Sequence, residues 1–232
     1  MVKNIYRSDE GGKSELGWLS SRFSFNFADY YNSKRNCFGK LLVLNDDIIG
    51  PGKGFGAHSH DNMEIITLVT KGELEHKDSI GNKEVLRVGE MQVMSAGRGI
   101  THSEYNHSKT KSLELFQIWI ETARPEITPR HETKKVDLKD NELTKVVSGD
   151  KKDKLLFINQ DAKISLGKFN IEEKMKYNLR KNKGLFVFVI EGNVEVDGEK
   201  LSRRDSIEIT NNSEVEILTK PGLYLMVVEV PV

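Results

Sequence analysis

Residues 54–82 read GFGAHSHDNMEIITLVTKGELEHKDSIGN, and this stretch decides the fold. The β-formers at residues 65–69 indicate one strand, and the polar–apolar alternation at residues 73–77 indicates a second. Gly72 separates the two, and Gly81-Asn82 is typical of a turn. The stretch therefore predicts paired strands, in which side chains two residues apart share a face.

The same pattern continues along the chain. Residues 85–89 lead from the turn into the next expected strand, and residues 115–120 (LFQIWI) form another. Short strands at regular spacing, with turn signals between them, are typical of an all-β protein. No long amphipathic helix is visible, and residues 137–147 are the one candidate for a short helix.

Two segments of the chain echo each other at an offset of 120 residues. Residues 68–75 read LVTKGELE and residues 188–195 read FVIEGNVE, each an apolar strand, a charged residue, a glycine and an alternating strand. A duplication explains this echo, although two β-hairpins also look alike by chance. A charged segment at residues 133–154 follows the first half. We therefore expect two domains, at residues 1–132 and 133–232.

Two pairs of metal-binding side chains lie in the first half. His58 and His60 form one pair and His102 and Glu104 the other, each with one residue between its members. In extended segments each pair directs its donors to one face. Three imidazoles and one carboxylate suit Fe, Mn, Co, Ni, Cu or Zn. All six histidines lie at or before His131, so the second half is expected to hold no such site.

The bulk composition excludes several classes of protein. The 232 residues contain 35 basic and 35 acidic side chains, and this neutral balance gives no support for direct nucleic-acid binding. No apolar run approaches the ~18 residues of a membrane span, and the start of the chain has no apolar signal segment. The single cysteine, Cys37, cannot form an internal disulfide. We expect a cytoplasmic protein.

Two glycine-led motifs surround the histidine pairs. From Gly52 the chain reads G-x5-H-x-H-x3-E, which ends at Glu64, and from Gly89 it reads G-x5-S-A-G-x4-H-x3-N, which ends at Asn106. These motifs resemble the two cupin motifs, whose strands line a small double-sheet barrel. The match is imperfect, because Ser95 replaces the usual proline and two spacings are longer. Cupins commonly take a carboxylate ligand from the first motif, which would select Glu64.

With these departures from the cupin motifs, the chain resembles a narrower family, the pirins. The segments that carry the resemblance are residues 17–32, 54–82, 94–106 (MSAGRGITHSEYN) and 116–120. The resemblance implies an all-β fold of two cupin (double-stranded β-helix, or jelly-roll) barrels in tandem. It implies one metal, normally iron, in the N-terminal barrel and none in a degenerate C-terminal barrel. It also implies that Glu104 is a ligand with His58, His60 and His102. Glu64 would then not bind the metal itself. It would lie next to the ligands as a base, accepting a hydrogen bond from a histidine N–H or taking up a proton.

The resemblance also bears on function. Some pirins show quercetin 2,3-dioxygenase activity, and others are redox-linked transcription cofactors that contact a protein partner. Three neutral imidazoles and one carboxylate around a divalent ion leave a net charge of about +1, which favours an anionic oxygen ligand. We therefore expect a dioxygenase, with Fe(II) as cofactor, that acts with O₂ on a flavonol or another small enolic or phenolic compound. The alternatives are a non-catalytic, redox-responsive regulator that contacts a protein partner and a metal-stabilised scaffold.

Five further residues fit ordinary structural roles. His76 is expected to be a packed or surface histidine, because it lies on a predicted hairpin and shares a strand face with Leu74. His107 and His131 are expected at the surface, because neither has a partner at ligand spacing. Arg98 lies between two glycines and should face solvent. Cys37 has no neighbouring base and should be a small apolar core residue.

Overall fold

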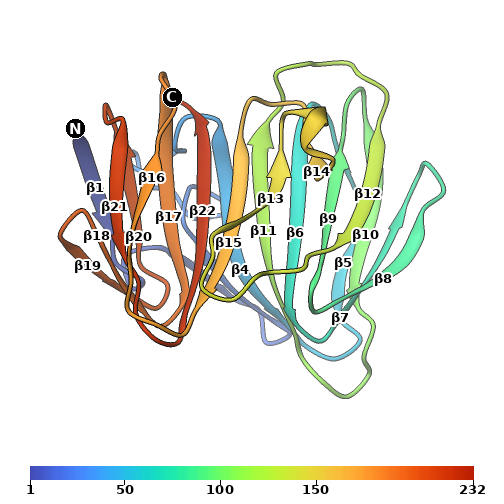
Figure 1. Cartoon of the computed structure of the whole chain (residues 1–232). Coiled ribbons are helices and arrows are strands. Elements are labelled where there is room, and N and C mark those ends of the chain that lie inside the picture. The colour runs from blue at the N-terminus through green and yellow to red at the C-terminus, as the bar shows by residue number, and fades with distance from the viewer.

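The computed structural model describes residues 1–232 and contains four β-sheets, two formed mainly by each half of the chain (Figure 1). The helical content is one 3₁₀ turn, η1 (Lys151–Asp153), and no helix has the length and apolar character to span a bilayer. The expected helix at residues 137–147 is wrong. Val146 and Val147 lie there on a strand and are buried, as β-branched side chains are in a sheet.

The first half forms one barrel from a large and a small sheet. The large sheet has the order β12 (Arg130–Lys135), β9 (Glu90–Ser95), β6 (Met63–Lys71), β11 (Leu113–Glu121), β4 (Leu41–Ile49), β3 (Leu19–Phe23) and β2 (Gly12–Glu15). The small sheet has the order β5 (Gly54–His60), β10 (Ile100–Asn106), β7 (Glu73–Asp78) and β8 (Lys83–Arg87).

The second half repeats this arrangement. Its large sheet has the order β1 (Val2–Tyr6), β20 (Ser206–Thr210), β17 (Lys183–Glu191), β22 (Leu223–Pro231), β15 (Lys163–Phe169), β13 (Thr144–Ser148) and β14 (Leu156–Phe157). Its small sheet has the order β16 (Lys174–Asn178), β21 (Glu214–Leu218), β18 (Asn193–Val196) and β19 (Glu199–Ser202).

The two barrels have the same number and order of strands, and they differ at one edge, where β14 runs parallel to β13 but β2 runs antiparallel to β3. The central strands β6 and β17 start 120 residues apart, and each is followed by a glycine with positive φ, 81° at Gly72 and 82° at Gly192. A side chain there would be strained, and at Gly72 its Cβ would meet the Ser112 carbonyl oxygen at 2.8 Å. The predicted strands at residues 65–69, 73–77 and 115–120 are all present, on β6, β7 and β11.

One edge strand of the second large sheet comes from the start of the chain. β1, at the N-terminus, pairs with β20 of the second barrel, where it takes the position that β12 has beside β9 in the first. The two-domain division at residues 132 and 133 stays a prediction. The structure adds that residues 130–135 form one continuous strand of the first barrel.

The large sheets pack against each other between the barrels. A cluster of 24 buried hydrophobic residues fills this interface and includes Ile66 and Leu68 of β6. Ile65 and Val69, on the other face of β6, are buried inside the first barrel. Both faces of β6 are therefore covered, which explains its continuous apolar run. The interior of the second barrel is filled by 15 buried apolar residues.

Candidate metal centre

The centre is built on the pairing of β5 with β10. These strands run antiparallel, and His58 lies directly opposite His102. The register shifts between His102 and Glu104, so β5 has an extra residue at this point. Beside the irregularity, His58 Nδ1 donates a hydrogen bond to the Gly56 carbonyl oxygen at 2.8 Å. The lone pair of His58 is then on Nε2.

Three imidazole rings converge here. Their centroids are 4.9 Å apart for His58 and His60, 4.4 Å for His58 and His102, and 5.0 Å for His60 and His102. One donor nitrogen from each ring lies within 4.8 Å of the others. Burial lowers the pKa of His102 to about 2 and that of His60 to about 4. Both rings are therefore neutral at pH 7, which is the form that binds a metal.

The fourth expected ligand, Glu104, lies near His102. Its carboxylate is 5% exposed and accepts hydrogen bonds from Gln117 Nε2 at 2.9 Å (Oε1) and 2.8 Å (Oε2). Burial raises the pKa of Glu104 to about 7. Its donor atoms group with those of His102 and His76 rather than with those of His58 and His60. His102 is thus common to both groups of candidate ligands.

The donor set fits a transition-metal ion. His102 is 3% exposed, and neither of its ring nitrogens has a hydrogen-bond partner. A buried polar group left without a partner costs about 1–3 kcal/mol. A cation held between the three rings would engage one of these nitrogens and remove part of that cost.

A cavity of about 520 Å³ opens onto the three histidines. Aromatic side chains form much of its wall: Trp18, Phe23, Phe27, Phe55 and Trp119. The Trp119 ring contacts the His60 ring at a centroid distance of 4.8 Å, so the apolar wall reaches the imidazoles. A mostly apolar cavity of this size with a few convergent polar groups is typical of a small-molecule site.

Known proteins share this arrangement over nearly the whole chain. The Pirin family model matches residues 6–120, and that of the quercetinase C-terminal cupin domain matches residues 145–230. A quercetin 2,3-dioxygenase of Escherichia coli is 38% identical over 227 residues, which are 98% of each chain. This chain belongs to the pirin family. A pirin-like protein of Caulobacter vibrioides is 35% identical over 224 residues, or 95% of this chain and 96% of that one.

A solved pirin has the same fold. The crystal structure of the bacterial pirin YhhW from Escherichia coli, in complex with nickel(II), superimposes with a TM-score of 0.95 at 36% identity and covers 99% of both chains. The expected all-β fold of two tandem cupin barrels is confirmed. The family matches and the nickel(II) complex of the relative support a metal-binding protein of the cupin type, without fixing which ion this chain binds.

Sequence reasoning missed one buried histidine of this pirin, His131, and left the burial of another, His76, open. His76 is fully buried, and the side chain of His131 is 5% exposed and stacks on it at a centroid distance of 4.7 Å. The expectation that His131 lies at the surface is wrong, because β12 brings it over β7 from 55 residues away. His76 Nδ1 accepts from Gln92 Nε2 at 3.0 Å, and His76 Nε2 donates to Asp78 at 3.3 Å. The contact of His76 with Asp78 follows from their spacing on β7, whereas no local spacing signals the contacts with Gln92 and His131.

The remaining expected residues have mixed outcomes. Glu64 is 1% exposed, accepts from Ser95 Oγ at 2.6 Å and from Asn159 Nδ2 at 3.2 Å, and does not line the cavity. Its role as a base stays a prediction, and its observed contacts tie it to the scaffold instead. Cys37 is exposed, so its expected place in the core is wrong. Arg98 and His107 are exposed, as expected.

Proposed function

We propose that this pirin is a metal-dependent dioxygenase that acts with O₂ on a flavonol or another small enolic or phenolic compound. The observation that supports it is the convergence of three imidazoles on an apolar cavity of about 520 Å³, with both His102 ring nitrogens unpartnered. The names of the relatives agree with this chemistry.

The proposed ligands are His58, His60 and His102 as nitrogen donors and Glu104 as the oxygen donor. His76 is the competing donor near Glu104, but both of its nitrogens already have partners. We propose iron(II) as the native ion. The Escherichia coli pirin was solved with nickel(II), so elemental analysis of the native protein is needed. When bound, a divalent ion of this kind lowers the pKa of a coordinated hydroxyl and supplies redox chemistry.

The chain itself contributes positioning and the exclusion of water. Gln117 fixes the Glu104 carboxylate through both oxygens, and the aromatic wall offers faces on which a planar ring can stack. Asp47 is the second carboxyl group lining the cavity, and burial raises the pKa of Asp47 to about 7. In this proposal Asp47, rather than Glu64, holds the proton that a substrate hydroxyl releases near neutral pH.

The test is O₂ uptake with quercetin by protein reconstituted separately with Fe(II), Mn(II), Co(II), Ni(II) and Cu(II). We expect turnover with at least one ion, and His102→Ala should lose both bound metal and turnover. The matched control is His107→Ala, because His107 is exposed and belongs to neither group of candidate ligands. Stoichiometric metal binding without O₂ uptake for every ion would contradict the enzymatic proposal and favour a non-catalytic regulator.

A further inference from the structure

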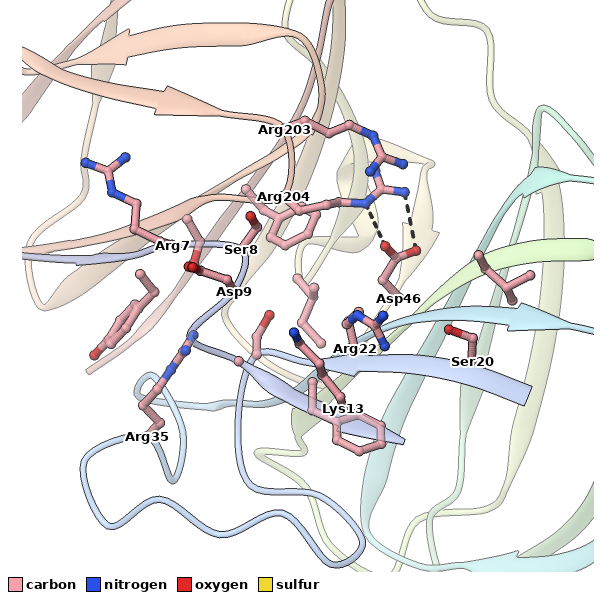
Figure 2. Close-up of a pocket in the computed structure, with 18 of the residues that line it drawn as sticks. Arg7, Ser8, Asp9, Lys13, Ser20, Arg22, Arg35, Asp46, Arg203 and Arg204 are labelled. Atoms are coloured by element: carbon pink, nitrogen blue, oxygen red, sulfur yellow. Dashed lines mark hydrogen bonds and ion pairs between the residues drawn. The ribbon is translucent and has the colours of Figure 1, made fainter. Parts of the chain in front are cut away.

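A second cavity, of about 390 Å³, lies where the two barrels meet (Figure 2). Its walls come from β3 and β4 of the first barrel, from the turn before β20 of the second, and from the segment after β1. Side chains alternate across β3 and β4. Arg22 and Asp46 therefore face this cavity, and their neighbours Ser21 and Asp47 face the metal centre. The two cavities share one two-stranded wall.

The lining of this inter-barrel cavity is basic. Six lining side chains are cationic and three are anionic, and the cationic ones are Arg7, Lys13, Arg22, Arg35, Arg203 and Arg204. Four of the arginines have carboxylate partners, namely Asp205 for Arg7, Glu15 for Arg22, Glu191 for Arg203 and Asp46 for Arg204. Figure 2 shows the last pair, in which Arg204 reaches across the junction to Asp46. Lys13 and Arg35 have no ion pair.

Arg35 is the unusual member of this set. It is 5% exposed, and neither Nε nor Nη1 has a hydrogen-bond partner. Its guanidinium lies 3.9 Å from the centroid of the Tyr6 ring, which shields one face. The buried Glu208 carboxylate interacts with Arg35 electrostatically, but it accepts its hydrogen bonds from Tyr6 and Asn4. A buried guanidinium with free N–H groups is costly unless an acceptor reaches it.

The geometry points to an oxyanion as that acceptor. We propose that the inter-barrel cavity binds a phosphate or diphosphate group, either free or as the ester of a small metabolite. Guanidinium groups match phosphate oxygens in paired, charge-assisted hydrogen bonds, and Ser8, Ser24 and Ser206 add hydroxyl groups to the lining. The volume exceeds what one phosphate needs, which leaves room for an ester portion.

Asp9 allows a test in which the affinity for the anion should rise instead of fall. This carboxylate lines the cavity and has no ion pair, so it opposes any bound anion. Removal of its charge by Asp9→Asn should strengthen binding, whereas Arg35→Gln should weaken it. A general effect on folding would not move the two variants in opposite directions.

The experiment is calorimetric titration of the metal-loaded protein with orthophosphate, pyrophosphate and glucose 6-phosphate at low ionic strength. We expect saturable binding of one ligand per chain, weakened by about tenfold or more in Arg35→Gln, since a charge-assisted hydrogen bond contributes that much. The tightest of the three ligands distinguishes a free anion from an ester. Binding should persist in His102→Ala, which separates this cavity from phosphate bound at the metal centre.

Two variants keep the result interpretable. Arg87→Gln removes the same charge from an exposed arginine outside the cavity and should leave the affinity unchanged. If Arg35→Gln does not fold, Lys13→Gln replaces it, because Lys13 is exposed and lacks an ion pair. The proposal is overturned if none of the three ligands binds saturably, or if binding is lost in His102→Ala and unaffected by the Arg35 and Lys13 substitutions.

Discussion

At the scale of single residues, the metal centre depends on burial more than on formal charge. His102 belongs to both groups of candidate donors, and burial together with the neighbouring His58 and His60 rings holds its pKa near 2. The imidazole is therefore ready to bind an ion at any physiological pH without first losing a proton. The same desolvation acts in the opposite sense on the carboxyl groups of the cavity and raises their pKa values.

Asp47→Asn tests this effect through stability. The carboxyl group of Asp47 has a pKa of about 7 in the folded protein, raised by burial from an ordinary value near 3.8. Between these pH values the folded chain keeps a proton that the unfolded chain has lost. The free energy of unfolding therefore falls as pH rises from about 4 to about 7, and is level above that. An asparagine cannot ionise, and its Oδ1 can still accept from Ser21 Oγ.

We expect the metal-free Asp47→Asn protein to be more stable than the parent at pH 8 and to have a shallower pH dependence. Urea denaturation at pH 5 and pH 8 measures both quantities. Some slope should remain, because Glu104 has a pKa raised in the same direction. Asp137→Asn, an exposed carboxylate, is the control. An unchanged slope in the Asp47 variant would show that this carboxyl group is already ionised at pH 5.

At the scale of elements, local pattern predicts strands but not their distant partners. The run at residues 65–69 and the alternation at residues 73–77 identify β6 and β7. The spacing of apolar residues along a strand follows from which of its faces are buried. The spacing of His58 and His60 places both rings on one face of β5, and the pairing of β5 with β10 brings them to His102. The position of β1 beside β20 and of His131 over His76 depends on pairings between distant segments, which no local period encodes.

Ile5→Ala tests how β1 is held on the second barrel. Ile5 pairs with Ile207 of β20 and packs against the apolar interior of the second barrel. Truncation of this partly buried side chain should destabilise the protein by about 1–2 kcal/mol. Val2→Ala, on the same strand but 49% exposed, should cost much less. Thermal unfolding compares the two, and equal effects would mean that β1 is not held by its packing.

At the scale of the whole molecule, the two barrels share one core. The cluster of 24 buried residues between the large sheets draws on both halves of the chain. Phe186 of β17 is fully buried there, and its ring lies 5.6 Å from that of Phe25 and 6.1 Å from that of Phe38, both from the first half. A defect on the second barrel therefore removes contacts that stabilise the first.

Phe186→Ala should consequently destabilise both barrels together, by about 3–5 kcal/mol. The two tryptophans, Trp18 and Trp119, both line the cavity of the first barrel, so their fluorescence reports on that barrel alone. In urea, this fluorescence and the far-ultraviolet circular dichroism of the whole chain should shift to the same lower midpoint. Ile171→Ala, at an exposed site in the second half, is the control. If the fluorescence midpoint stays at the parent value while part of the dichroism is lost earlier, the barrels unfold independently, and the shared core does not couple the metal-binding half to its partner.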